Sequence, residues 1–176
     1  MNIYIILLII FAFVAIMALL YFNGYTKLKK YKEKMDKAEQ IIDTNLEKKL
    51  ELIISINSEV KKVTGKKDYL KDYIAIKDLI ITNIEKDLKL DEAIKLINEL
   101  ILDFSDLYNN KNFTQKLNEL RQIDEVLISA KNMFNQNAIY SNQMIKLFPN
   151  NIIAKLSNFK IRSFYTNNKT DDHETF

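Results

Sequence analysis

Carboxylates are the first candidates for chemistry in this sequence, because several recur at helical spacing. Three of them follow at steps of four residues: Asp43, Glu47 and Glu51. Such a row lies on one helix face and could hold a metal, as in di-iron bundles, with Asp124-Glu125 adding ligands from a later helix. Those sites also use Glu-x-x-His pairs, and the one histidine, His173, lies in the C-terminal tail. We therefore favour a solvated face balanced by Lys48 and Lys49, and we expect no metal or other cofactor.

Nucleophilic catalysis also lacks its usual partners in this sequence. The chain has no cysteine, which excludes thiolate nucleophiles, thiolate metal sites and disulfides. Because the histidine is confined to the tail, a Ser-His-Asp arrangement has no base in the folded region. Phosphate-binding loops use several glycines, whereas the whole chain has two. We predict that the protein is not an enzyme and has no small-molecule substrate.

Two asparagines remain as polar candidates. Asn135 and Asn142 are seven residues apart, so they share a helix face with the spacing of a bundle seam. A buried asparagine is costly unless it is hydrogen-bonded. The pair could join two helices, form a recognition strip for a partner, or belong to a solvated face. We favour the structural role.

The elements that would position these residues begin with an apolar segment. From Ile3 to Phe22 the sequence carries no charge, and about 20 helical residues span the roughly 30 Å hydrocarbon core of a bilayer. A cleaved signal peptide fits less well, because no basic residue precedes the run and no Ala-x-Ala site follows it. Residues 1–25 are therefore predicted to be an uncleaved transmembrane anchor.

Lysines predict the orientation of this anchor. Six of them follow the apolar run closely: Lys27, Lys29, Lys30, Lys32, Lys34 and Lys37. The N-terminal flank has no basic residue, and basic flanks stay cytoplasmic. We predict a single-pass cell-membrane protein with the N-terminus outside and the remaining domain in the cytoplasm. The same lysines could contact anionic lipid headgroups.

Residues 26–165 are long enough for one domain with a hydrophobic core. The formal net charge of +3 is small, which argues against a nucleic-acid partner. Apolar residues follow steps of three and four through the first predicted helix, from Thr26 to Thr64. Gly65 would cap that helix, and Asp68 would cap the next one. The polar tail, residues 166–176, is predicted to be disordered.

The rest of the domain also shows helical periodicity. A second helix is predicted from about Tyr69 to Leu90 and a third from Asp91, although no glycine or proline marks this break. One long helix, giving a three-helix domain, is the alternative. A polar loop at 109–112 precedes a last long helix, Phe113 to Phe148, which Pro149 ends. Helices joined by short loops pack antiparallel. The predicted fold is all-α: one transmembrane helix and an up-down four-helix bundle with long first and last helices.

The final segment, residues 151–165, is both apolar and basic. It could dock on a membrane surface or on a partner protein. Alternatively it folds back over the end of the bundle, and we favour this arrangement because Phe148-Pro149 turns the chain back.

Several stretches together resemble the LemA family. In the last third they are Phe134-Asn135, Asn142, Ile145, residues 148–154, Phe159 and Phe164-Tyr165. In the first helix they are Met35, Ala38, Ile42-Asp43, Leu46 and Lys48-Lys49. The chain departs from the family pattern at Ser141, Asn150 and Asn158, and it lacks the usual proline near Ser55. The resemblance implies a four-helix bundle behind one membrane helix, no established enzymatic activity, and envelope functions such as membrane-protein quality control.

Three functions remain open from the sequence. The favoured one is a non-catalytic scaffold or adaptor that recruits an unidentified protein partner at the membrane. A stalk or stator-like subunit, anchored by one span and built as an extended helical dimer, is the second. A membrane-anchored enzyme with a carboxylate metal site is the third.

Overall fold

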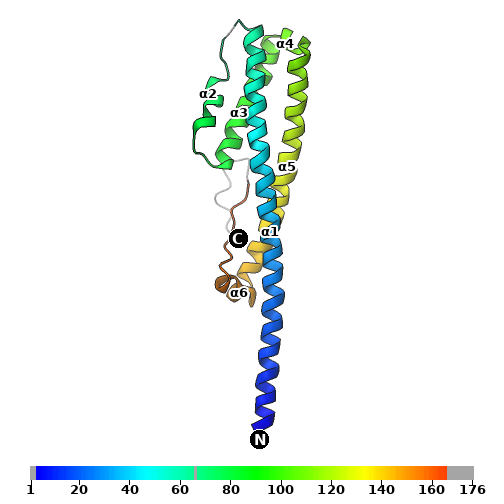
Figure 1. The fold of residues 1–176 in the computed structure, drawn as a ribbon, viewed down its shortest axis with the longest axis vertical. Helices are drawn as coiled ribbons and strands as arrows, with labels where there is room; N and C mark the ends of the chain where they lie inside the picture. Colours follow the sequence, from blue (N-terminus) through cyan, green and yellow to red (C-terminus); the bar gives the residue numbers. More distant parts are fainter. Residues whose placement is uncertain (1–2, 66, 166–176) are drawn as a thin grey trace. The chain divides into compact units, whose positions relative to one another are not determined.

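The computed structural model describes residues 3–65 and 67–165, and every regular element among them is helical (Figure 1). The elements in chain order are α1 (Ile3–Val63), α2 (Lys71–Ile74), the 3-10 turn η1 (Ala75–Asp78), α3 (Asn83–Asp103), α4 (Asp106–Asn109), α5 (Lys111–Lys146) and α6 (Asn150–Leu156). The all-α class is confirmed. The predicted disordered tail and His173 lie outside the described residues.

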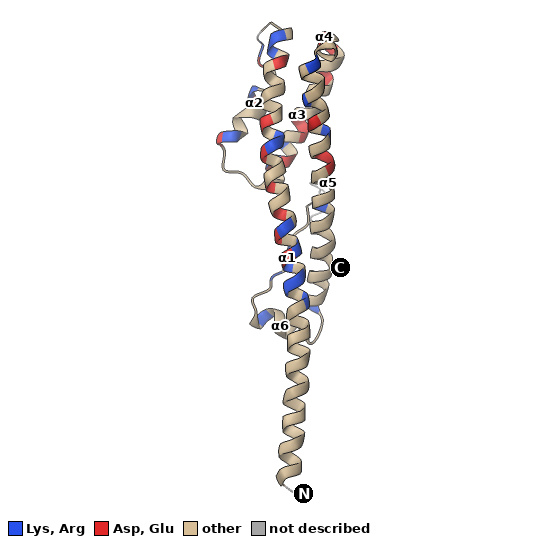
Figure 2. Ribbon diagram, turned by 45° about the vertical axis from the view of Figure 1, so that its right-hand side comes forward, with Lys and Arg blue, Asp and Glu red and all other residues tan. Residues whose placement is uncertain are grey.

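Helix α1 begins with the apolar segment and continues without a break past Gly24. In the described part of the chain, it is the one helix long and apolar enough to cross a membrane, with a mean hydropathy of 3.2 over the most apolar window. None of that window is buried in the molecule. Figure 2 shows neither acidic nor basic residues on this first part of α1. The first predicted helix, Thr26 to Thr64, is therefore continuous with the apolar segment in the structure.

The chain divides into two compact units, which α1 and α5 both pass through. We call Met1–Lys37 with Met133–Phe164 the anchor unit, and Ala38–Asn132 with Tyr165–Phe176 the core unit. The predicted domain boundaries, 1–25, 26–165 and 166–176, stay a prediction.

The core unit has a buried interior supplied by α1, α3 and α5. Side chains on the predicted stripe of α1 are buried there, including Ile42, Leu46, Leu50, Ile53 and Ile56. Contacts give the directions of the helices. Lys86, near the start of α3, pairs with Glu47, while Asn110, beyond its end, bonds to Glu59, so α3 runs in the same direction as α1. Lys116 contacts Glu59 and Asp124 contacts Lys49, so α5 runs in the opposite direction.

The predicted second helix, Tyr69 to Leu90, is wrong. The chain forms the short α2 and η1, becomes extended at Leu79, and starts α3 at Asn83. The cause is a capping box: the Thr82 hydroxyl accepts a hydrogen bond from the Glu85 backbone, and the Glu85 carboxylate accepts one from the Thr82 backbone. Helix α3 then runs through the predicted break at Leu90. The described residues thus contain three long helices, and the four-helix bundle is not confirmed.

Two helix caps were predicted near the end of α1, and the structure confirms one of them and contradicts the other. Gly65 has φ +77°, the left-handed conformation expected just past a helix end. Asp68, however, does not cap α2, whose N-terminal residue Leu70 makes no side-chain capping bond. The Asp68 carboxylate instead accepts a hydrogen bond from Asn57 at 2.9 Å and pairs with Lys61 at 2.5 Å, because the loop turns it back onto α1.

In the anchor unit, the segment after α5 folds back as expected. Ile153 and Ala154 of α6 are buried against Leu28 of α1, with Tyr25 and Phe159 packed at the edge. This contact places α6 beside the stretch of α1 that directly follows its uncharged residues.

Candidate functional site

Asn142 acts as a clamp between α5 and the C-terminal segment of the anchor unit. Its side-chain Nδ2 donates to the Arg162 carbonyl at 2.8 Å, and its Oδ1 accepts from the Arg162 backbone nitrogen at 3.0 Å. The Arg162 guanidinium lies over the Phe134 ring, 5.6 Å from its centre. Satisfying both groups of the amide removes the cost of placing it in a partly buried position. The geometry at Asn142 is that of a structural contact.

Asn135 lies on α5 in the same unit and is half-buried. The sequence predicted these two asparagines as one seam, and both lie on α5. Nearby polar residues that the sequence did not single out are more deeply buried: Ser141 and Asn137. Ser141 stands where the family resemblance leads one to expect an aromatic residue, and its neighbour Tyr140 stacks on Tyr31 with ring centres 5.8 Å apart.

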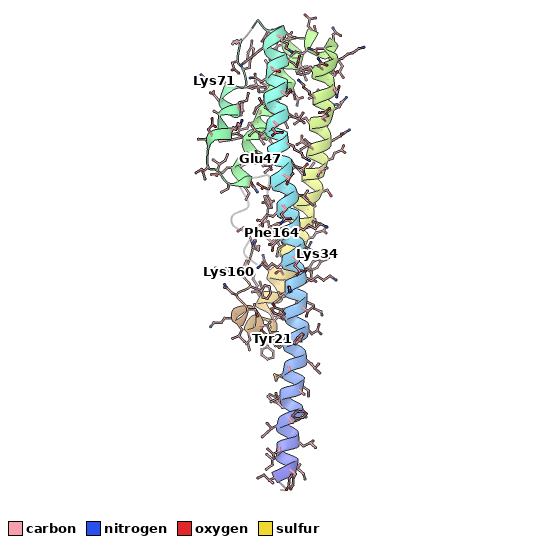
Figure 3. The ribbon with its side chains drawn as sticks, viewed as in Figure 1. Tyr21, Lys34, Glu47, Lys71, Lys160 and Phe164 are labelled. Atoms are coloured by element: carbon pink, nitrogen blue, oxygen red, sulfur yellow. The ribbon has the colours of Figure 1, made fainter. Side chains whose placement is uncertain are left out.

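At Gly24, α1 packs tightly against α6. A Cβ atom at this position would lie 2.5 Å from Asn150 Oδ1 and 2.5 Å from Ile153 Cδ1. On either side, the Tyr21 hydroxyl is 3.2 Å from the Ser157 hydroxyl, and the Tyr25 ring meets Phe159 edge-on at 5.8 Å. Figure 3 labels Tyr21 on α1. Gly24 is therefore a packing contact between α1 and α6.

The core unit contains a group of buried charges that links three helices. We call it the lysine–aspartate cluster: Lys49 of α1, Asp87 and Asp91 of α3, and Asp124 and Lys131 of α5. Lys49 is 1% exposed, and its Nζ lies 2.6 Å from Asp91 Oδ1 and 2.8 Å from Asp124 Oδ1. Asp87 is buried and pairs with Lys131.

The carboxylates keep the Lys49 ammonium charged. Burial alone would lower its pKa, but hydrogen bonds and attraction from Asp124 and Asp91 outweigh burial and raise the pKa. A lysine held as a cation cannot serve as a nucleophile or general base at neutral pH. The arrangement therefore ties helices together, and it offers no catalytic amine.

The solvated face predicted around Lys48 and Lys49 is wrong for Lys49. Lys48 is exposed, as are the carboxylates of the suggested row, Asp43, Glu47 and Glu51. Lys49 is buried because it stands three residues after Leu46 and four before Ile53, on the apolar stripe. That spacing was the available signal. Within residues 3–65 and 67–165, no group of three or more His, Asp or Glu residues is placed to hold a metal.

A surface groove lies between α1 and α5 of the core unit. Its lining consists of Lys48, Glu51, Leu52, Glu119, Gln122, Ile123 and Val126. Leu52, Ile123 and Val126 supply the apolar part of this lining, which we call its apolar floor, and the other lining residues are charged or carry an amide. An apolar strip with a polar rim is a common anatomy for protein recognition. The sequence did not identify it, because its two walls are about 70 residues apart in the chain.

Comparison with known proteins connects these features to a family. The model of the family described as LemA family matches residues 38–175, which is most of the chain. The matched region includes the lysine–aspartate cluster, the groove and the Asn142 clamp. No curated protein matches the chain.

Proposed function

This chain belongs to the LemA family, and we propose that it is a membrane-anchored, non-catalytic scaffold that recruits a protein partner at the cell envelope. The anchor fixes its location, and the helical domain presents the recognition surface. As part of this proposal, the domain follows an up-down bundle course in which α2 and η1 stand in place of the second of four helices.

The exposed apolar segment supports the membrane anchor. A core helix of a water-soluble domain would bury its apolar side chains, whereas none of the most apolar window of α1 is buried. Large side chains such as Phe11, Phe13 and Leu19 are all exposed there. A bilayer would cover them.

We infer the orientation from the lysines that follow the span, with the N-terminus outside and the domain in the cytoplasm. Since the chain has no cysteine, a single Asn109→Cys substitution at the exposed last residue of α4 allows the test in intact cells. Asn110 is unsuitable, because its Oδ1 accepts hydrogen bonds from the backbone of Asn112 and Phe113. A membrane-impermeant thiol reagent should label the Asn109→Cys variant after lysis only.

The reciprocal control for topology is Asn2→Cys at the other side of the span. This variant should be labelled in intact cells. The opposite result before lysis would be labelling of Asn109→Cys and no labelling of Asn2→Cys. It would show that the orientation is reversed, and the search would turn to partners outside the cytoplasm.

The groove in the core unit is the observation that carries the scaffold role. A photo-crosslinking amino acid at Gln122, inside the groove, should give an adduct of defined mass in cells. The same amino acid at the exposed Tyr108, outside the groove, should not. The Val126→Lys substitution places a charge on the apolar floor and should abolish the Gln122 adduct. Equal adducts from both positions, insensitive to Val126→Lys, would count against the groove.

A stalk-like subunit is the second candidate, because α1 continues as one helix of 61 residues. A stalk would be an extended helical dimer. Analytical ultracentrifugation of the full-length chain in detergent distinguishes the two: a monomer supports the scaffold, and a stable dimer at low concentration supports the stalk.

A further inference from the structure

Helix α6 leaves an apolar face uncovered in the anchor unit. We use the name α6 face for four exposed apolar side chains: Ile152 and Leu156 of α6, and Leu147 and Phe148 of the turn that leads into it. Phe148 is 76% exposed and Leu156 is 73% exposed. Ile152 and Leu156 are one helical turn apart, on the side away from the buried Ile153 and Ala154. Bulky apolar side chains that remain exposed together mark contact with a membrane or a partner.

The position of the α6 face on α1 indicates which of these it contacts. Helix α6 packs on residues 21–28 of α1, through Tyr21, Gly24, Tyr25 and Leu28. The uncharged run of α1 ends at Phe22, and its first lysine is Lys27. Helix α6 therefore lies at the end of the apolar segment, where a span leaves the hydrocarbon core for water. Figure 2 shows this arrangement, with α6 beside α1 at the point where charged residues first appear.

The charged residues of α6 and of the sequence on either side of it are all basic, while α1 contributes Glu33 and Asp36 to a pocket that Ser157 and Phe159 also line. Between Val126 and Thr170 the sequence contains no aspartate or glutamate. Lys155 and Lys160 are exposed beside the α6 face, and Lys27, Lys29 and Lys30 follow the span on α1. Apolar side chains with neighbouring lysines are the composition of segments that bind the interface of anionic bilayers.

We propose that α6 is a second membrane contact, lying in the interface of the bilayer that α1 spans. Its face of Leu147, Phe148, Ile152 and Leu156 enters the boundary between headgroups and acyl chains. Lys155 and Lys160 contact the phosphates of anionic lipids. This inference rests on the membrane anchor proposed above, and it adds a site where the protein recognises the lipid surface.

Tryptophan fluorescence tests the proposal in the full-length protein. The chain has no tryptophan, so one replacement gives a signal from one position. Three exposed aromatic residues form a matched set: Phe148 on the α6 face, Phe11 in the apolar segment and Tyr108 in the core unit. Each variant, Phe148→Trp, Phe11→Trp or Tyr108→Trp, is reconstituted in vesicles of phosphatidylcholine and phosphatidylglycerol. Bromine atoms on the acyl chains quench a tryptophan that reaches them.

We expect brominated lipid to reduce the emission of the Phe148→Trp variant about two-fold. It should reduce the emission of Phe11→Trp at least as much, and it should leave the emission of Tyr108→Trp unchanged. If brominated lipid quenches Phe11→Trp but leaves Phe148→Trp unquenched, like Tyr108→Trp, the proposed α6 contact is wrong. The membrane anchor would still stand. An unquenched Phe11→Trp would refute the anchor, and the α6 contact with it. Blue-shifted but unquenched emission from Phe148→Trp would show that protein, such as a second copy, covers the face instead.

A charge reversal tests the lipid specificity. Lys155→Glu combined with Lys160→Glu should reduce the quenching of Phe148→Trp in anionic vesicles but not in vesicles of phosphatidylcholine alone. The matched control reverses two exposed lysines of the core unit, Lys77→Glu and Lys95→Glu, and should leave the quenching unchanged. Equal quenching in all variants and both lipids would overturn the contribution of the lysines.

Discussion

Lys49 carries a buried positive charge whose partners come from two other helices. Replacing it with methionine would keep the apolar stem but leave Asp91 and Asp124 without their cation. Removing one partner of a buried ion pair typically costs about 3–5 kcal/mol. Because Asp91 and Asp124 are 40% and 32% exposed, water can solvate them after the substitution, and we expect Lys49→Met to lower the free energy of unfolding by a smaller amount, about 1.5–3 kcal/mol. Denaturant titration of the full-length chain in detergent, followed by circular dichroism, measures it.

The neighbouring lysine provides the control for this prediction. Lys48 is exposed, so Lys48→Met should change the free energy of unfolding by no more than about 0.5 kcal/mol. Equal effects of the two substitutions would show that the lysine–aspartate cluster does not stabilise the core unit.

Glu59 gives the core unit a dependence on acid. Hydrogen bonds from Lys62 foremost, and also from Lys116 and Asn110, lower its pKa below the ordinary 4.5, against the opposing effect of burial. A lowered carboxylate pKa contributes stability above pH 4.5, and this contribution is lost as the pH falls through the folded-state value. Glu59→Gln should therefore weaken the chain at pH 7 and flatten its loss of stability below about pH 4.5.

The pH dependence of stability is measured as the midpoint of denaturant unfolding, determined at a series of pH values from neutral to acid. Glu99→Gln, at an exposed position on α3, should keep the parent profile. If the stability of the Glu59→Gln variant falls with acid pH as steeply as that of the parent, other carboxylates determine the acid dependence of stability.

At the residue scale, the sequence singled out Asn135 and Asn142 as polar candidates and misplaced Lys49 on the surface. The structural role favoured for Asn142 agrees with its two hydrogen bonds to Arg162. Lys49 was assigned to the surface because lysines are rarely buried unless they are paired. Its carboxylate partners are 38 to 75 residues away in the chain, so no local pattern could reveal the pairing.

The capping box at Thr82 determines where α3 begins. Thr82→Ala removes the hydroxyl that accepts from the Glu85 backbone, and such a loss costs about 1 kcal/mol. Thr44, exposed in the middle of α1, is the matched control, because Thr44→Ala only replaces threonine with a better helix former. We expect denaturant unfolding to show a loss for Thr82→Ala and none for Thr44→Ala. The reverse order would mean that packing, and not the cap, fixes the start of α3.

Gly24 determines whether α6 can dock on α1. A leucine there would occupy the space of the Asn150 and Ile153 side chains, since its Cβ atom alone would lie 2.5 Å from an atom of each. We expect Gly24→Leu to displace α6 and to speed amide hydrogen exchange in residues 150–162 at least ten-fold. Ala18→Leu, the same enlargement at an exposed position of α1, should leave this exchange unchanged. Slow exchange in both variants would show that α6 is held by other contacts.

At the scale of elements, hydrophobic periodicity predicted α1 and α5 well, because each carries a long stripe of apolar side chains. It failed between Gly65 and Leu90, where Tyr73, Ile76, Ile80 and Ile84 mimic a helical repeat. A local signal did exist, since Thr82-x-x-Glu85 is a capping-box sequence. Periodicity alone overlooked it.

For the whole molecule, the strongest expectation concerns insertion in the membrane. An arginine at the centre of a transmembrane helix costs about 2.5–3.5 kcal/mol. Ala12→Arg combined with Phe13→Arg should therefore move the protein to the soluble fraction on alkaline carbonate extraction. Ala12→Leu combined with Phe13→Leu should leave it in the membrane fraction. Retention of the double-arginine variant would show that the apolar segment is not what anchors the chain.

The helical class, the helix long and apolar enough to span a membrane, and the family could all be predicted at this scale, because each depends on composition or on patterns continuous in sequence. The groove could not be predicted in the same way. Its walls, residues 48–52 and 119–126, become neighbours only when α1 and α5 pack.

The close packing at Gly24 also bears on membrane thickness. Contacts at Tyr21, Gly24, Tyr25 and Leu28 fix the register of α6 along α1, so α6 cannot slide by a turn without losing them. If α6 lies in the interface, the length of hydrocarbon that α1 crosses is set on one side by that register. A thicker or thinner bilayer would then be accommodated by helix tilt or by deformation of the lipid. Such a protein would favour the membrane whose thickness matches its span.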